Sequence, residues 1–265
     1  MSLEQNVSTE QKIRKGIPGS TLKIIAIVTM LIDHIAAVVL DGYLVNIGFY
    51  NRMTNMFVLA PTETTMTKVI YVIDMVMRLI GRLGFPLFCF LLVEGFFYTK
   101  SRTRYAFRLF LFALISEIPF DLALGLTDNY LPEFSYQNVY FTLFLGLLTI
   151  WGLNQTKKWY TRLPILLLGL VVASLLRTDY GALGVATIVL MYVFRKKSNV
   201  ASMLAGCITL TLGQLLEITS FADVYLVSRY NGERGLKLKY VFYFFYPVHL
   251  FILYLIKLLV LNGMG

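Results

Sequence analysis

The chain contains only two histidines, and each lies in an apolar stretch. His34 follows Asp33 within "IIAIVTMLIDHIAAVVL" (24–40), and His249 lies within "YFFYPVHLFILY" (243–254). If both stretches are helices, His34 lies ~18 Å from the beginning of its helix and His249 lies ~14 Å from the beginning of its own. Both histidines would then lie near the centre of a bilayer. An imidazole there could act as a general base. It could equally do no more than hydrogen-bond between helices.

The helix around His34 carries further charged residues. Lys23, His34 and Asp41 fall on one helical face, while Asp33 points about 100° away from it. A carboxylate beside the base could fix its tautomer and support the imidazolium. Asp33 fills that role only if the local geometry allows, because adjacent helical residues diverge, and a carboxylate from another segment is an equal candidate.

A second apolar stretch carries Asp74, Arg78 and Arg82 at i, i+4 and i+8, so all three lie on one side of a helix. Asp74 and Arg78 can partly neutralise each other. Arg82 lies just before "GFP" (84–86), where we expect a kink, and it needs a carboxylate from another segment or an anionic ligand. Glu94 follows on the same stretch and is a further candidate site residue.

The remaining candidates are carboxylates and amides near helix ends. Glu117 and Asp121 flank a proline in "SEIPFD" and face one side, where they could match Arg82 or bind a cation. Asn138 and Asp179 lie near predicted helix ends, where capping is the commoner role. The spacing of cysteines and histidines predicts no metal site.

Composition defines the elements that must position these residues. The chain has 265 residues, of which 57% are hydrophobic and 15% charged, whereas soluble domains carry about 25% charged residues. Long apolar stretches recur throughout. We therefore predict an all-α, polytopic integral membrane helical bundle of about eight transmembrane helices, possibly more. The predicted spans are 22–42, 69–98, 106–126, 139–154, 163–177, 181–194, 199–221 and 240–261.

The basic residues predict how the bundle is oriented. We divide the chain into a cytoplasmic N-terminal segment, 1–20, and a transmembrane domain, 21–265, with both termini in the cytoplasm. This topology puts most Lys and Arg residues inside, as the positive-inside rule requires, so the net charge of +9 needs no nucleic acid to explain it. The basic segment 222–239 falls outside and breaks the rule, which indicates either a local exception or a miscounted span.

Seven motifs together resemble a known family. They are "MLIDHIAAV", "GRLGFPLFCFLLVEGF", "RLFLFALISEIPFDLAL", "QNVYFTLFLGLL", "DYGALGV", "YNGERG" and "FYFFYPVHL", and they run in order along nearly the whole chain. The chain resembles the TraX family of membrane acetyltransferases, which is similar to the acyltransferase-3 and heparan-glucosaminide acetyltransferase group.

The resemblance implies a function and a location. An acetyl or short acyl group would pass from cytoplasmic acyl-CoA to an amine or hydroxyl of a peptide, a protein N-terminus or a glycan, in a bacterial plasma membrane. By similarity, the family's motif positions fall on Asp33, His34, Arg82, Glu94, Glu117, Asp121 and His249. Basic residues such as Arg104 and Arg108 could contact the phosphates of CoA, although membrane topology explains such residues without a ligand.

Two other classes compete with an enzyme. In a proton- or cation-coupled transporter, Asp33, His34, Glu117 and Asp121 would form a relay. Transporters usually contain inverted repeats, and no repeat is visible in this sequence. A non-catalytic membrane scaffold leaves the charges within the apolar stretches unexplained.

Overall fold

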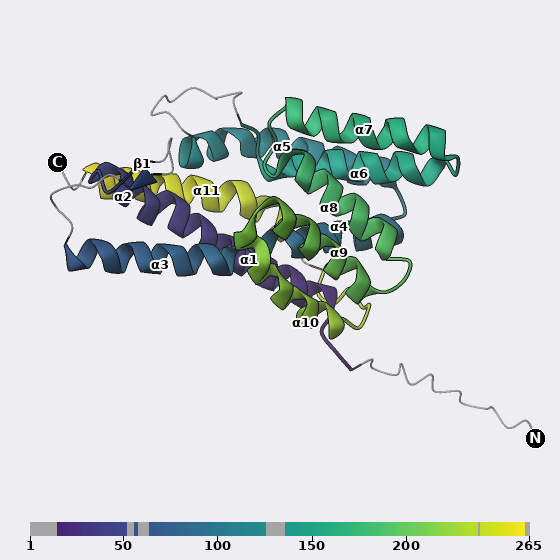
Figure 1. The fold of residues 1–265 in the computed structure, drawn as a ribbon, viewed down its shortest axis with the longest axis horizontal. Coiled ribbons are helices and arrows are strands. Elements are labelled where there is room, and N and C mark those ends of the chain that lie inside the picture. Colours follow the sequence, from purple (N-terminus) through teal and green to yellow (C-terminus); the bar gives the residue numbers. More distant parts are fainter. Residues whose placement is uncertain (1–14, 52–55, 58–63, 126–135, 238, 263–265) are drawn as a thin grey trace, which may run out of the picture.

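The computed structural model describes residues 15–51, 56–57, 64–125, 136–237 and 239–262. Within them the fold is a bundle of helices (Figure 1). Two short strands of two residues each, Tyr50–Asn51 (β1) and Met56–Phe57 (β2), pair antiparallel. Most of the predicted segment 1–20 lies outside the described residues. The longer helices are α1 (Gly19–Ile35), α3 (Thr65–Gly81), α4 (Gly84–Tyr98), α5 (Arg102–Leu124), α6 (Val139–Gln155), α7 (Trp159–Leu175), α8 (Gly181–Phe194), α9 (Asn199–Gly213) and α11 (Lys239–Asn262).

The first helix contains an irregularity directly after the predicted site. α1 continues through a π-helical turn, Ala36–Leu40, into the short helix α2 (Asp41–Asn46). A π-helical turn holds more residues than an α-helical turn, and such turns are frequent at functional sites. The turn shifts Asp41 away from the face predicted for it, because that prediction assumed a regular α-helix from Lys23 onward.

The second predicted span is broken into two helices. α3 ends at Gly81 and α4 begins at Gly84, so the chain turns at Arg82 and Leu83, and the predicted kink is confirmed. Glycine is required at position 81 because a Cβ atom there would lie 2.2 Å from the Cβ of Asp33. This close approach brings Arg78 near the end of α3, and Arg82 just after it, next to α1.

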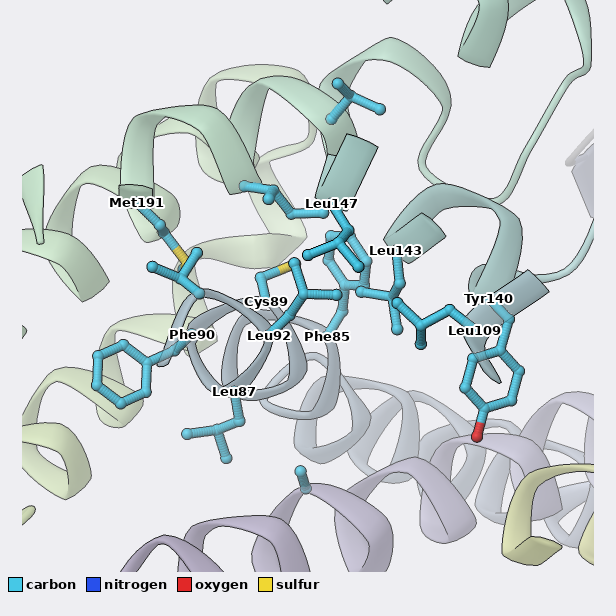
Figure 2. Close-up of a cluster of buried hydrophobic side chains, with 14 of the residues drawn as sticks. Phe85, Leu87, Cys89, Phe90, Leu92, Leu109, Tyr140, Leu143, Leu147 and Met191 are labelled. Atoms are coloured by element: carbon cyan, nitrogen blue, oxygen red, sulfur yellow. The ribbon is translucent and has the colours of Figure 1, made fainter. Parts of the chain in front are cut away.

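α4 forms the centre of the bundle. Ten of its fifteen residues are buried, so it is apolar on every side. Figure 2 shows its side chains Phe85, Leu87, Cys89, Phe90 and Leu92 radiating from the helix among residues of its neighbours. Those neighbours include Leu109 of α5, Tyr140, Leu143 and Leu147 of α6, and Met191 of α8. A rigid α4 fixes the positions of Arg82 and Glu94, one near each end of the helix.

The seventh predicted span is shorter than expected. α9 ends at Gly213, and the chain turns back through a 3-10 helix, Leu215–Phe221 (η2), and helix α10 (Ala222–Ser228), both of which pack against α9. The prediction of one span over 199–221 is therefore wrong in its second half. It followed the apolar composition and missed the turn at Gly213 and Gln214.

This turn brings segment 229–235 to the beginning of α1. Tyr230 forms a parallel bridge with Ile17, and the amides of Gly19 and Ser20 donate to the carbonyls of Glu233 and Arg234 at 2.7 and 3.0 Å. Of the two explanations for the basic segment 222–239, the structure supports the miscounted span, because residues 229–235 lie beside the start of α1 and not at the opposite end. The basic residues of this segment join those near the start of α1, so the exception to the positive-inside rule disappears.

The last helix consequently runs in the direction opposite to the prediction. α11 begins at the same end as α1, where the Lys23 ammonium lies 5.4 Å from the centre of the Phe242 ring, and both helices finish near α2 at the left of Figure 1. The described chain therefore starts and finishes at opposite ends of the bundle. The prediction of both termini on the cytoplasmic side is therefore not confirmed.

Three helical stretches are long and apolar enough to cross a membrane: Gly19–Asn46, Thr65–Tyr98 and Tyr240–Val260. α6, α7, α8 and α9 are apolar but shorter. Large apolar side chains are exposed along α3, α5, α7 and α11, for example Val72, Ile118, Leu168 and Leu259 at 57% or more. Such faces are typical of helices that lie against lipid, and the fold is that of a helical membrane protein.

Labelling from the two sides of a membrane tests the direction of α11. In separate Lys237→Cys and Lys257→Cys variants, we expect an impermeant maleimide to react from opposite sides of oriented vesicles. The native Cys89 and Cys207 are fully buried and give little background. Labelling of both variants from the same side would contradict the parallel arrangement of α1 and α11.

Candidate functional site

The two histidines meet in the structure. His34 of α1 and His249 of α11 lie with Nδ1 of His34 2.7 Å from Nε2 of His249, and their ring planes differ by 2°. Nδ1 of His249 lies 2.8 Å from the carbonyl oxygen of Phe245, one turn earlier in α11. His249 is buried and His34 is partly buried. The sequence predicted similar depths for the two histidines, and in the structure they are in direct contact. The helix that carries His249 runs in the direction opposite to the predicted one.

The hydrogen bonds determine which nitrogen holds each proton. A carbonyl oxygen only accepts, so Nδ1 of His249 carries a hydrogen and donates to Phe245. In a neutral His249, Nε2 is then an acceptor, and Nδ1 of His34 must donate to it. A neutral pair is favoured because a buried charge without a counter-charge is costly. We infer that Nε2 of His34 has a free lone pair, which is the arrangement a general base requires.

Asp33 has a different partner from the one considered for it. Its Oδ2 accepts from Nη1 of Arg78 at 2.7 Å, and its carbonyl oxygen lies 3.5 Å from the same nitrogen. The tautomer of His34 is held instead by His249. The ion pair between Asp33 and Arg78 therefore holds α1 against α3, and it does so at the residue directly before His34.

Arg82 finds the carboxylate from another segment that its position required. Its Nη1 donates to Oε1 of Glu217, in the 3-10 helix η2, at 3.2 Å. The side chain of Glu217 is 1% exposed and that of Arg82 15%, so the pair is largely shielded from solvent. Sequence reasoning missed Glu217. The signal was available, because it is the only charged residue in "GQLLEITSF" (213–221) and lies within a predicted span.

Glu94 does not join this group. It pairs with Nε of Arg195, just past the end of α8. Glu94 lies twelve positions after Arg82, or ~18 Å along a helix. Its ion pair with Arg195 does not involve His34, so the catalytic role expected for Glu94 stays a prediction.

The predicted carboxylate pair on α5 serves a helix junction. Oε2 of Glu117 accepts from the Asn138 side chain and, at 3.3 Å, from the Asn138 amide. The Asn138 side chain also caps α6 by accepting from the Tyr140 amide at 3.0 Å, as predicted. The backbone carbonyl of Asp121 accepts from the Gly125 amide at 2.8 Å, near the end of α5.

Asp179 lies in the loop between α7 and α8, where Tyr136 donates to its Oδ1 at 2.8 Å. Burial raises the pKa of this carboxyl to about 6, although the Tyr136 hydroxyl partly opposes the shift. The loop holds the junction further because the Thr142 hydroxyl donates to the Asp179 carbonyl oxygen. Asp179 therefore positions the start of α8 beside α6 and is not in contact with the histidines in any recorded hydrogen bond.

A cavity of about 610 Å³ lies at the end of the bundle where α1 begins. Tyrosines and phenylalanines from several helices line it, together with Glu94 and four basic residues: Lys23, Lys100, Arg108 and Arg234. Arg108 is therefore placed to contact a ligand, and its guanidinium lies 5.8 Å from the centre of the Tyr105 ring. Arg104 is exposed and does not line the cavity, so a role for Arg104 in this cavity is not supported.

The features described so far are a histidine pair in an apolar bundle and a basic, aromatic cavity. Within the described residues, no group of three or more His, Cys, Asp or Glu side chains is placed to hold a metal ion. The TraX protein family matches residues 18–257, which is nearly the whole chain and contains every candidate site residue described above. The chain belongs to the TraX family.

A curated relative supports this assignment. The TraX-family chain is 32% identical over 200 residues to the probable fimbrial assembly protein FimC, serogroup H1, of Dichelobacter nodosus. The match covers 67% of this chain and 81% of that protein. No solved structure matches.

Proposed function

We propose that this TraX-family protein is a membrane acyltransferase that moves an acetyl or short acyl group from acyl-CoA to an amine or hydroxyl. The acceptor class is a peptide, a protein N-terminus or a glycan. The observation that carries the proposal is the hydrogen-bonded series from His34 through His249 to the Phe245 carbonyl, because it leaves a base within an apolar bundle. Family membership and the fimbrial-assembly relative support it.

In the proposed reaction, Nε2 of His34 takes the proton from the acceptor as its nitrogen or oxygen attacks the thioester carbonyl carbon. The carbon–sulfur bond then breaks, and the same proton passes to the sulfur of CoA. While His34 is positively charged, its Nδ1 hydrogen bond to His249 stabilises it. We assign Arg82 to the oxyanion that forms on the carbonyl, since it is a cation in a site shielded from solvent.

The cavity suits acyl-CoA as the donor. Its volume lies within the range of about 300–1,000 Å³ typical of small-molecule sites. Four basic residues line it for the phosphates, and its aromatic rings can stack on adenine. It lies at the more basic end of the bundle, which the positive-inside rule assigns to the cytoplasm. We accordingly propose a multi-pass protein of the bacterial inner membrane.

A direct assay separates this proposal from transport. Protein reconstituted in nanodiscs is mixed with acetyl-CoA and a panel of peptides and amino sugars. Release of free CoA is followed together with the acetyl mass on the acceptor. We expect both to depend on the protein. Absence of acyl transfer to any acceptor, combined with proton or cation flux in proteoliposomes, would replace the enzyme with the transporter alternative.

Replacement of Arg108 with alanine tests the donor cavity. We expect the KM for acetyl-CoA to rise about tenfold with little change in kcat, the equivalent of losing one charge-assisted contact worth about 1.4 kcal/mol. Arg104→Ala is the matched control, because Arg104 lies one turn away on the same helix but outside the cavity. Equal KM values for the two variants would place the donor elsewhere.

A further inference from the structure

A pair of tyrosines separates the cavity from the histidines. Tyr140 of α6 lines the cavity, and its ring packs edge-on against Tyr246 of α11, with centroids 5.2 Å apart. Tyr246 does not line the cavity but packs against both histidine rings, 5.9 Å from His34 and 5.6 Å from His249. The order from the cavity inward is therefore Tyr140, Tyr246 and the histidine pair.

Both rings are held in place. Tyr140 is 8% exposed and Tyr246 3%. The Tyr140 hydroxyl contacts the carbonyl oxygens of Phe242 and Tyr243, each at 3.3 Å. Pro247, four residues after Tyr243, has no amide hydrogen, so the Tyr243 carbonyl lacks its usual helical partner and is free to accept from Tyr140. The proline thus anchors α11 to the tyrosine of α6.

This arrangement restricts what can reach His34. An acyl group that enters from the cavity must bring its carbonyl carbon to the acceptor atom whose proton Nε2 of His34 removes, while its chain fits beside the two rings. A methyl group is small enough for a packed aromatic environment, whereas each added methylene has to displace a buried ring. A pocket of this kind discriminates by about 10–200-fold per methylene.

We infer that Tyr140 and Tyr246 form a barrier that limits the donor to acetyl and other short acyl groups. The inference rests on the proposed acyltransferase function and adds the residues that determine chain length. Tyr246 is the main determinant, because it lies between Tyr140 and both histidines. Tyr140 contributes through its ring, while its hydroxyl positions α11.

The test compares acetyl-CoA, butyryl-CoA and hexanoyl-CoA as donors. In the wild type we expect hexanoyl-CoA to compete with acetyl-CoA for binding but to react at least tenfold more slowly. In Tyr246→Ala we expect the ratio of kcat/KM for hexanoyl-CoA over acetyl-CoA to rise at least tenfold. Tyr98→Ala, at an exposed position away from the histidines, is the control and should leave the ratio unchanged.

Each outcome has a distinct meaning. Equal turnover of hexanoyl-CoA and acetyl-CoA by the wild type would overturn the barrier, as would an unchanged ratio in an active Tyr246→Ala variant. Should Tyr246→Ala fail to fold, Tyr246→Leu and the wild-type competition measurement still decide the question. Wild-type protein that transfers no acyl group from any of the three donors would instead overturn the proposed function.

Discussion

Replacement of His34 with alanine is expected to lower acyl transfer by about 10²–10⁴-fold, the usual contribution of a general base. The expected loss is in kcat, because His34 does not line the cavity in which the donor is proposed to bind. The measurement is CoA release by protein in nanodiscs at saturating acetyl-CoA. Full activity in His34→Ala would remove this residue from the mechanism.

Replacement of His249 distinguishes the role of a general base from that of a residue that only positions the base. In His249→Ala, Nδ1 of His34 loses its acceptor, so the imidazole can rotate and change tautomer. We expect a smaller loss than in His34→Ala, again in kcat. In His249→Gln, a side-chain oxygen that reaches Nδ1 of His34 would restore part of the rate. A loss in His249→Ala as large as in His34→Ala, without rescue by glutamine, would indicate that His249 has a direct chemical role.

Removal of the Glu217 carboxylate is expected to destabilise the protein strongly. Glu217→Ala removes the ion-pair partner of the largely shielded Arg82 guanidinium, and breaking a buried ion pair in this way costs about 3–5 kcal/mol. Arg82→Ala is expected to be similarly harmful. The thermal unfolding temperature of each variant in detergent, compared with that of the wild type, measures both effects. A Glu217→Ala variant as stable as the wild type would show that the pair contributes nothing to the fold.

A double replacement distinguishes stability from activity. Arg82→Met combined with Glu217→Leu removes both charges together, so most of the stability should return. Activity should not return, because Arg82 is the proposed oxyanion partner. Arg104→Met is the matched control for removing an exposed arginine and should leave stability within about 0.5 kcal/mol of the wild type. Recovery of both properties would give Arg82 a purely structural role.

Some features of the site could be predicted because they depend on local chemistry alone. A charge in an apolar stretch must find a partner, and this requirement predicted either a carboxylate from another segment or an anionic ligand for Arg82; Glu217 is such a carboxylate. Asn138 has the side chain and position of a helix cap, and it is one. The break before α4 follows from the glycine and proline at 84 and 86.

Other features depended on the direction in which helices run, which apolar composition does not encode. The apolar composition of a helix is the same in either direction along the membrane normal. The depth of His249 could therefore be counted from the sequence, but the side of the membrane at which its helix begins could not. The turn at Gly213 and Gln214 reversed the remainder of the chain. One missed turn accounted both for the end of the bundle to which 222–239 was assigned and for the direction predicted for α11.

The sequence by itself therefore determined a helical membrane protein of the TraX family with two histidines at similar depth, because hydrophobicity, periodicity and motifs are properties of the chain. The tertiary structure decided which groups meet. It placed His249 against His34, paired Asp33 with Arg78 and Glu94 with Arg195, and supplied Glu217 from a 3-10 helix as the partner of Arg82. These pairings join residues up to 215 positions apart, and only the packing of whole helices can select them.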